Sequence, residues 1–275
     1  MRIEVKNLRH VYSPGTDFAF EALQDVSLTV EAGEVFGIVG GTGSGKSTLV
    51  SHMNLLLEPT SGEVLIDGVD ARTMKKSVLR RRVGLVFQFP ESALFAPTVE
   101  EDVAFGPERL GLDEDEVRKR VEGTLGMLGV GHLAPRSPHA LSGGEKRRVA
   151  MAGVLAMGPE AIILDEPTAG LDPATREELL NVVRGLKESG MSIVIVSHDL
   201  DEISEVSDRV CLMEGGSVKA AGKPSDVFYE HPENAPGTVR VALAVSERLF
   251  PDTVGRPVRF SETVEALERV MRRNP

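Results

Sequence analysis

Eight residues near the start of the chain constrain its fold more than any other feature. They read Gly-Gly-Thr-Gly-Ser-Gly-Lys-Ser and span Gly40–Ser47. The nearly continuous apolar run Val35–Val39 precedes them, which is typical of a central strand in a parallel sheet. Ser47–Leu57, which follows, is predicted to form a helix. A glycine-rich loop between a buried strand and a helix predicts an α/β fold with a phosphate-binding turn at one edge of the sheet.

The loop fits the P-loop pattern, in which two glycines five positions apart are followed by lysine and serine. Its glycines let backbone N–H groups face phosphate oxygens, and the helix start adds a partial positive charge. Lys46 is predicted to neutralise the β- and γ-phosphates, and the Ser47 hydroxyl to ligate Mg²⁺. The alternative, a chance glycine-rich turn, is disfavoured by the flanking strand and helix. The predicted nucleotide contacts are Gly40, Gly41, Thr42, Gly43, Ser44, Gly45, Lys46, Ser47 and Thr48.

Composition narrows the classes of function. The chain has 275 residues, of which 41% are hydrophobic, and a net charge of −11. An acidic balance argues against nucleic acid as a partner, because phosphate backbones attract basic surfaces. The single cysteine, Cys211, excludes a disulfide within the chain and is expected to be a buried apolar residue. No apolar stretch approaches the roughly 20 residues of a membrane span, so membrane association would require a partner.

Strand-like and helix-like segments alternate along residues 1–230, which predicts a mainly parallel sheet. The exception is the segment from about residue 90 to 158, where helices dominate and which we interpret as an inserted helical subdomain. Residues 231–275 are predicted to form a small helical C-terminal appendage. The predicted strands are Ile3–Val5, Val26–Val30, Val35–Val39, Glu63–Asp67, Val83–Phe87, Ala161–Leu164, Ser192–Val196 and a hairpin over Arg209–Gly222; the predicted helices after Leu57 are Asp113–Leu128, Gly144–Met157, Ala174–Glu188, Val239–Phe250 and Ser261–Arg273.

Two acids end the apolar strand Ala161–Leu164. Carboxylates at the carboxyl end of a parallel strand lie where ligands bind in open α/β sheets. Asp165 is predicted to hold Mg²⁺, through water, and Glu166 to polarise the attacking water as a general base. Solvated acids after strands are common, so the prediction depends on the phosphate loop in the same chain.

A second predicted anion site is formed by Leu141-Ser142-Gly143-Gly144-Glu145-Lys146-Arg147-Arg148, which places a serine and two glycines at a helix start. An ordinary serine-capped helix is the alternative. Together with the P-loop, and 23 residues before Asp165, this motif resembles the ATP-binding-cassette (ABC) ATPase family. The resemblance covers about residues 1–230 and implies a P-loop NTPase fold with an N-terminal antiparallel β subdomain. It also implies ATP and Mg²⁺ as ligands.

The resemblance extends to four further positions. Gln88 matches the family glutamine that contacts Mg²⁺ and the attacking water, and His198 matches the histidine that contacts the γ-phosphate. Ala169-Gly170-Leu171-Asp172 is similar to the D-loop. Tyr12 stands where the family stacks an aromatic ring on adenine, although packing near a strand end is the alternative for this residue.

In this family two ATPase domains dimerise head to tail, so that each ATP lies between two subunits. The resemblance therefore implies that Ser142, Gly143, Gly144 and Asp172 contact the ATP held by the P-loop of a partner. ATP would link the two subunits and hydrolysis would release them. The partner could be a second copy or a related chain.

Two segments resemble a narrower group, the ATPases of energy-coupling factor (ECF) transporters. They are Gln88–Phe95 and Thr98–Pro107, and Val11–Thr16 adds to the likeness. The resemblance implies an ATPase on the cytoplasmic face of the membrane, docked beneath a transmembrane coupling subunit. A separate membrane-embedded subunit would capture a vitamin or a transition-metal ion. Phe89, Leu94 and Phe95 are the candidates for the docking surface. Ala93 and Glu145 depart from the family pattern, which usually has glutamine at both positions.

Two other functions fit the shared motifs. The chain could power another type of ABC transporter, or it could be a cassette ATPase that acts on ribosomes or DNA. The second alternative is disfavoured because no paired cassette or long coiled coil is found in the sequence and the charge balance is acidic.

Overall fold

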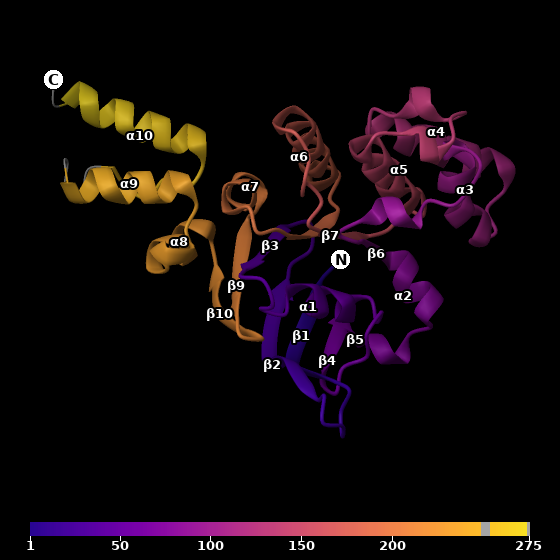
Figure 1. Cartoon of the computed structure of the whole chain (residues 1–275), viewed down its shortest axis with the longest axis horizontal. Helices are drawn as coiled ribbons and strands as arrows, with labels where there is room; N and C mark the ends of the chain where they lie inside the picture. Colours follow the sequence, from indigo (N-terminus) through magenta and orange to yellow (C-terminus); the bar gives the residue numbers. More distant parts are fainter. Residues whose placement is uncertain (249–253, 274–275) are drawn as a thin grey trace.

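Two sheets with different strand pairing organise the chain in the computed structural model, which describes residues 1–248 and 254–273 (Figure 1). The larger sheet contains β3 (Val35–Gly40), β6 (Val83–Val86), β7 (Ala161–Asp165), β8 (Ser192–Val196), β9 (Arg209–Glu214) and β10 (Ser217–Gly222). Its order is β10-β9-β3-β8-β7-β6, and every pair is parallel except β10 with β9. The predicted mainly parallel sheet is confirmed.

The smaller sheet is antiparallel, as the family resemblance implied. It contains β1 (Ile3–Tyr12), β2 (Phe20–Val30), β4 (Ser61–Ile66) and β5 (Val69–Asp70), in the order β2-β1-β4-β5. The first two strands extend well beyond the predicted Ile3–Val5 and Val26–Val30. Their pairing continues through several bulges as far as Tyr12 opposite Phe20. Bulges break the strict alternation of buried and exposed residues, which is the signal that a sequence offers for a strand.

Helices pack on both faces of the larger sheet and at both ends of the molecule. Helices α3–α5 come between β6 and β7, where an inserted helical region was predicted, and lie at the opposite end of the molecule from α9 and α10 (Figure 1). The helices are α1 (Lys46–Met53), α2 (Lys76–Arg82), α3 (Val99–Arg109), α4 (Glu114–Met127), α5 (Gly143–Ala156), α6 (Pro173–Glu188), α7 (Leu200–Val206), α8 (Pro224–Glu230), α9 (Gly237–Arg248) and α10 (Phe260–Arg273).

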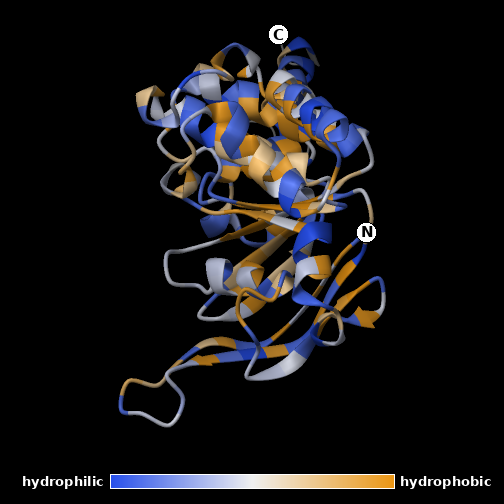
Figure 2. Cartoon of the chain, turned by 90° about the vertical axis from the view of Figure 1, so that its right-hand side faces the viewer, coloured by the Kyte–Doolittle hydropathy of each residue, from blue (hydrophilic) through white to orange (hydrophobic). Residues whose placement is uncertain are grey.

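The larger sheet separates two hydrophobic cores. Val35 and Val39 of β3 join the core formed with α3–α7, whereas Phe36 and Ile38 join the core formed with α1 and the antiparallel sheet. This division follows from the alternation of side chains along a strand. Figure 2 shows the hydrophobic residues concentrated along the strands and inside the layer of helices. Burial on both faces explains why the central strands are apolar throughout.

Further predicted boundaries also differ from the structure. Helix α1 ends at Met53 and not at Leu57, because Leu55 has a left-handed backbone (φ 50°) and the Asn54 side chain accepts a hydrogen bond from the Leu56 N–H. Strand β6 ends at Val86, one residue before the predicted end. Helix α9 is described as far as Arg248, and the last two residues of the predicted Val239–Phe250 helix lie outside the described residues.

The hairpin of β9 and β10 turns at Gly215-Gly216, as predicted. Both glycines have positive φ angles, 55° and 81°, which a tight two-residue hairpin requires. Cys211 on β9 is fully buried, in agreement with its predicted role as a core residue. Burial raises the pKa of its thiol to about 12, so the side chain behaves as a small apolar group.

Candidate nucleotide site

The carboxyl ends of the parallel strands bring the predicted site residues to one edge of the larger sheet. Strands β6 and β7 pair Val86 with Leu164, and β7 and β8 pair Asp165 with Val196. Gln88 and His198 each lie two residues beyond the ends of β6 and β8, and these strands flank β7, which ends at Asp165. The glycine-rich loop leaves β3 at the same edge, which is where open α/β sheets bind ligands.

The loop adopts a backbone that only glycine allows at its first position. Gly40 has a φ of 151°, and a Cβ atom there would lie 2.3 Å from the carbonyl oxygen of Met213. Further along, Lys46 begins α1 and folds back over the loop. Its Nζ donates hydrogen bonds to the carbonyl oxygens of Gly40 (2.8 Å) and Gly41 (2.9 Å). The loop is thus a closed turn with a cation held at its mouth.

Charges of both signs meet beneath this loop. Lys46 is buried, and burial lowers the pKa of its ammonium group, while the nearby carboxylates of Glu166 and Asp165 act in the opposite direction. A buried cation that is only partly compensated favours an additional anion, such as a phosphate group. The phosphate contact of Lys46 stays a prediction, and this charge balance is the physical reason to expect it.

Asp165 offers an oxygen atom that no protein group satisfies. Its Oδ1 is buried and makes no hydrogen bond among the described residues. Burial raises the pKa of the carboxyl group, and a hydrogen bond from the Ser47 hydroxyl opposes this shift. No cluster of three or more His, Cys, Asp or Glu side chains in the described residues is arranged to hold a metal ion. One carboxylate and one hydroxyl instead suit Mg²⁺, which usually combines few protein ligands with water and phosphate oxygens.

Glu166 and His198 form a hydrogen-bonded pair at the next position of the edge. The Nδ1 atom of His198 lies 2.7 Å from Oε2 of Glu166. The carboxylate of Glu166 is buried, whereas the imidazole of His198 is 71% exposed. The histidine is therefore the member of the pair that solvent or a ligand can reach. The backbone of Glu166 is left-handed, with a φ of 52°. A non-glycine residue in this conformation is a strained position of the kind found at functional sites.

Two exposed aromatic side chains, Tyr12 and Phe20, form an aromatic wall beside the loop. Tyr12 is 39% exposed, and its hydroxyl lies 3.2 Å from the hydroxyl of Thr48. It lines a cavity of about 210 Å³ together with Phe20, Ala22, Gly43, Gly45, Lys46, Ser47 and Thr48. Phe20 was not identified from the sequence, although it pairs directly with Tyr12 and is 61% exposed. Only the register of the β1–β2 hairpin places it in the cavity.

The four residues expected to act on a partner's ATP gather on one surface. Ser142 caps α5, and its N–H and hydroxyl each donate to Oε2 of Glu145 at 2.8 Å. A Cβ atom on Gly144 would lie 3.3 Å from Thr175 in the first turn of α6 and 3.5 Å from Leu171 of the D-loop. Asp172 caps α6 by accepting hydrogen bonds from Thr175. The serine-glycine motif and the D-loop therefore form one continuous surface.

Arg147 on α5 links the helix of the serine-glycine motif to the loop that precedes α6. The side chain is buried, and its guanidinium donates to the carbonyl oxygens of Pro167 (3.2 Å) and Ala169 (2.5 Å). These carbonyls directly follow Glu166. The sequence motif indicated only that Arg147 lies on a helix, and the contact joins segments 20 residues apart. Arg147 therefore connects α5 to the loop that begins at Glu166.

Comparisons with known proteins agree with this geometry. Residues 23–169 match the family described as ABC transporter. An energy-coupling factor transporter ATP-binding protein, EcfA2, of Symbiobacterium thermophilum is 47% identical over 98% of this chain and 97% of its own length. The protein of the same name from Clostridioides difficile is 43% identical over 91% of each chain.

Solved structures extend the similarity to the whole architecture. The cbiO1 protein of Clostridium perfringens, part of the ABC transporter complex cbiONQ, superposes with a TM-score of 0.77 at 40% identity, covering 90% of this chain and 95% of cbiO1. The dimeric bacterial ABC transporter cassette MJ0796 gives a TM-score of 0.71 at 32% identity, over 80% of this chain and 98% of its own. The chain therefore belongs to the ABC transporter ATPases and, among them, to the ATP-binding proteins of energy-coupling factor transporters.

Proposed function

We propose that this chain is the ATP-hydrolysing motor of an ECF transporter and works as one half of a dimer. The observation that carries the proposal is the meeting of Lys46, Asp165 and Glu166 beneath the glycine-rich loop, with His198 bonded to Glu166. ATP would lie with its phosphates on the loop and its base toward Tyr12. A second cassette, identical or related, would supply Ser142, Gly143, Gly144 and Asp172.

In the proposed reaction the chain positions water against the γ-phosphate. Glu166 accepts a proton from this water as general base, and His198 keeps the carboxylate oriented through its hydrogen bond. Lys46 stabilises the charge on the β- and γ-phosphates. Asp165, Ser47 and Gln88 would hold Mg²⁺, which neutralises phosphate charge when it is bound. Gln88 is exposed beyond β6, where it can reach a ligand at the sheet edge.

The helical region α3–α5 is the proposed contact with the transmembrane subunit. None of the described helices is long and apolar enough to cross a membrane, and a motor of this kind acts through a partner. Phe89 and Phe95 are exposed, and Phe95 packs edge-on against Phe105 with ring centres 5.0 Å apart. Leu94, the third residue proposed for docking, is buried in the core and cannot take part directly.

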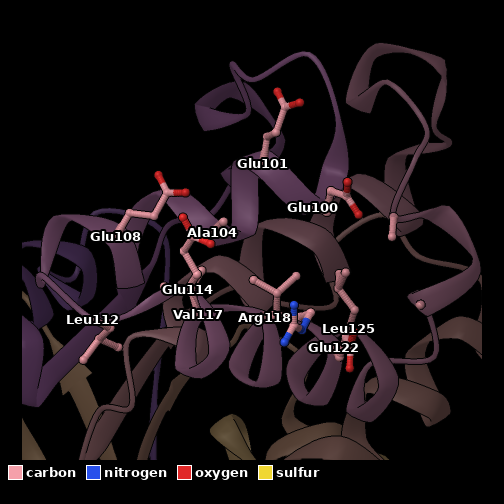
Figure 3. A pocket seen from close by; sticks show the side chains of 13 residues that line it. Glu100, Glu101, Ala104, Glu108, Leu112, Glu114, Val117, Arg118, Glu122 and Leu125 are labelled. Carbon is pink, nitrogen blue, oxygen red and sulfur yellow. The ribbon is translucent and has the colours of Figure 1, made fainter.

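An acidic groove on the same region suits a basic helix of that partner. Helices α3 and α4 border a cavity of about 850 Å³ with an apolar floor that includes Val117 and Leu125 (Figure 3). Carboxylates surround this floor, and Figure 3 shows Glu101, Glu108 and Glu114 among them. An amphipathic helix with basic flanks would complement both the floor and the rim.

Membrane co-purification tests the proposed assembly. The chain, expressed with the transmembrane and substrate-binding subunits of its own transporter, should be recovered with the membrane fraction and should hydrolyse ATP there. The double charge reversal Glu101→Lys with Glu108→Lys should reduce recovery with the membrane, whereas Glu188→Lys on α6 should not. Recovery of the unaltered chain in the soluble fraction alone would contradict the proposed assembly.

A further inference from the structure

Two buried histidines lie directly behind the aromatic wall of the nucleotide site. His52 on α1 is fully buried and His10 on β1 is nearly so. The Nε2 atom of His52 lies 3.1 Å from Nδ1 of His10, and the two rings meet edge to face with centres 4.7 Å apart. Neither residue belongs to the phosphate loop or to the strand ends that carry the proposed chemistry. Imidazoles in such a position need a reason, since apolar side chains would fill the same space without loss of hydration.

The contacts of the pair fix where its protons lie. Nδ1 of His52 is 2.7 Å from the carbonyl oxygen of Thr48, which can only accept, so Nδ1 carries the hydrogen. Burial lowers the pKa of His52, which keeps the ring neutral and leaves Nε2 as an acceptor. Nδ1 of His10 must then be the donor between the two rings. Nε2 of His10 has no hydrogen-bond partner in the described part of the chain.

The pair is connected to Tyr12 from two directions. The ring of His10 meets the ring of Tyr12 edge-on, with centres 4.5 Å apart and planes at 81°. On the other side, the Tyr12 hydroxyl lies 3.2 Å from Oγ1 of Thr48, the residue whose carbonyl holds His52. Tyr12, Thr48, His52 and His10 thus form a closed ring of four contacts that joins β1 to α1. Tyr12 is the one member with a substantially exposed side chain, and it lines the cavity beside the loop.

We propose that His10 and His52 are positioning residues, which hold the Tyr12 ring in the orientation that receives a nucleotide base, and that proton uptake by His52 weakens nucleotide binding. The proposal rests on the proposed function, because it requires a base to lie against Tyr12. It assigns no direct contact between either histidine and the nucleotide. Their effect is exerted through the ring of contacts, and it concerns the base and not the phosphates.

The surroundings of the pair determine the direction of the pH effect. The groups that act on His52 are the carbonyl oxygens of Thr48 and Glu58 and the ring of His10. The carboxylate of Glu58 is fully exposed and is paired with Lys76 at 2.7 Å. No carboxylate hydrogen-bonds to either imidazole within residues 1–248 and 254–273. An added proton would therefore place an unpaired charge in the buried ring of contacts and disrupt it, so that binding weakens as the pH falls.

The test compares two probes on the full-length chain. ATP would contact both Tyr12, through its base, and the phosphate loop, through its phosphates. Inorganic tripolyphosphate has no base and would contact the loop alone. Calorimetric titration at about pH 8 should show that Tyr12→Ala weakens ATP binding about fivefold or more, in line with the value of base stacking on an aromatic ring. His52→Leu should also weaken ATP binding. Neither substitution should change the affinity for tripolyphosphate by more than about twofold. The double variant should bind ATP no more weakly than Tyr12→Ala.

The pH dependence of binding distinguishes the proposed role of His52 from a role in folding alone, because a residue needed only for folding would not change how ATP affinity varies with pH. Between about pH 8 and about pH 5.5, the ratio of ATP affinity to tripolyphosphate affinity should fall further in the unaltered chain than in His52→Leu, in which the titration of the two ligands alone remains. If His52→Leu does not fold, His52→Phe replaces it, because phenylalanine keeps a ring against His10 and removes the nitrogen atoms of residue 52. The ratio should change with pH in that variant by no more than it changes in His52→Leu.

The outcomes separate this proposal from the proposed function. Loss of tripolyphosphate binding in the unaltered chain would contradict the phosphate site itself. If Tyr12→Ala lowers the affinity ratio but the histidine variants keep the full ratio and its pH dependence, the positioning role is wrong. If Tyr12→Ala leaves the ratio of ATP affinity to tripolyphosphate affinity unchanged, no base lies on Tyr12, and the positioning role of the histidine pair is wrong as well.

Discussion

The imidazole of His198 is bonded through Nδ1 to Oε2 of Glu166, at 2.7 Å. Glu166 is buried and begins the segment that leads into the D-loop, whereas His198 lies at the surface after β8. The bond therefore joins two loops that leave neighbouring strands. Because the exposed member is the histidine, a ligand that reaches the edge of the sheet can act on the buried carboxylate through it.

Replacement of Glu166 by glutamine should abolish turnover and leave binding intact. An amide cannot accept the proton from water, so steady-state ATP hydrolysis is expected to fall by about 100-fold or more. ATP affinity, measured by titration without turnover, should stay within about twofold, because the amide has nearly the same shape. His198→Ala should also lower turnover, since the carboxylate would lose its orienting partner. Unchanged hydrolysis in Glu166→Gln would rule out this residue as the base.

Replacement of Lys46 by alanine should weaken nucleotide binding itself. The loss removes a charge-assisted contact with the β- and γ-phosphates, for which about 2 kcal/mol, or roughly 30-fold in affinity, is a reasonable expectation. Equilibrium titration with ATP measures the effect. Lys119→Ala, an exposed lysine of α4, serves as the control and should bind ATP normally. An alanine variant at Lys46 with full affinity would contradict the phosphate assignment.

Glu145 should oppose ATP-driven association of two cassettes. Its carboxylate accepts hydrogen bonds from the N–H and hydroxyl of Ser142, and the bond from this N–H is the largest cause of its lowered pKa. A phosphate that approaches Ser142 from a partner would meet this negative charge. Glu145→Gln keeps the shape of the cap and removes the charge. We expect a lower ATP concentration to suffice for dimerisation, by about threefold or more.

Size-exclusion chromatography at graded ATP concentrations, in the Glu166→Gln background, measures this association. The matched control is Glu116→Gln, because Glu116 occupies the same third position of α4 and is paired with Arg120 far from the motif. Dimerisation that needs as much ATP as before, or more, would show that the charge of Glu145 does not reach the bound phosphate.

Glu202 should make the stability of the fold depend on pH near neutrality. Burial raises the pKa of its carboxyl group to about 7, against an opposing hydrogen bond from Thr168. A raised pKa in the folded state means that the contribution to stability is complete below the unfolded value of about 4.5 and is lost as the pH rises through about 7. Glu202→Gln should therefore be more stable than the unaltered chain at about pH 8.5, by up to about 3 kcal/mol.

Urea denaturation at about pH 5 and about pH 8.5 measures the difference between the two proteins. Comparison at each pH cancels the titration of other groups, which both proteins share. The variant should gain stability, relative to the unaltered chain, at the higher pH. A difference that is the same at both pH values would mean that Glu202 titrates normally in the folded protein.

The parts of the site that are contiguous in sequence could be predicted before the structure was known. The loop from Gly40 to Ser47 and the acids after β7 each lie within one strand–turn unit, so local pattern and strand position specify them. His198 and Gln88 required the family resemblance, because a single histidine or glutamine after a strand has many roles. Their neighbourhood follows from the strand order β8-β7-β6, which the sequence does not state.

Residues that act across long separations could not be predicted. His10 and His52 are 42 residues apart and meet only because β1 packs against α1. Phe20 joins the cavity through a hairpin register that includes bulges, and alternation does not reveal such a register. The family resemblance predicted Leu94 at a docking surface together with Phe89 and Phe95, yet its side chain turns into the core. In each case tertiary packing decides what the local sequence leaves open.

The left-handed backbone of Glu166 has a consequence for attempts to engineer this protein. Glycine or asparagine would adopt a φ of 52° with less strain than glutamate, so either substitution is expected to relieve the fold while it removes the base. A library screened only for heat resistance would therefore enrich inactive chains at this position. Screens for thermally more stable variants should keep Glu166 unchanged, or should measure ATP turnover as well as thermal stability.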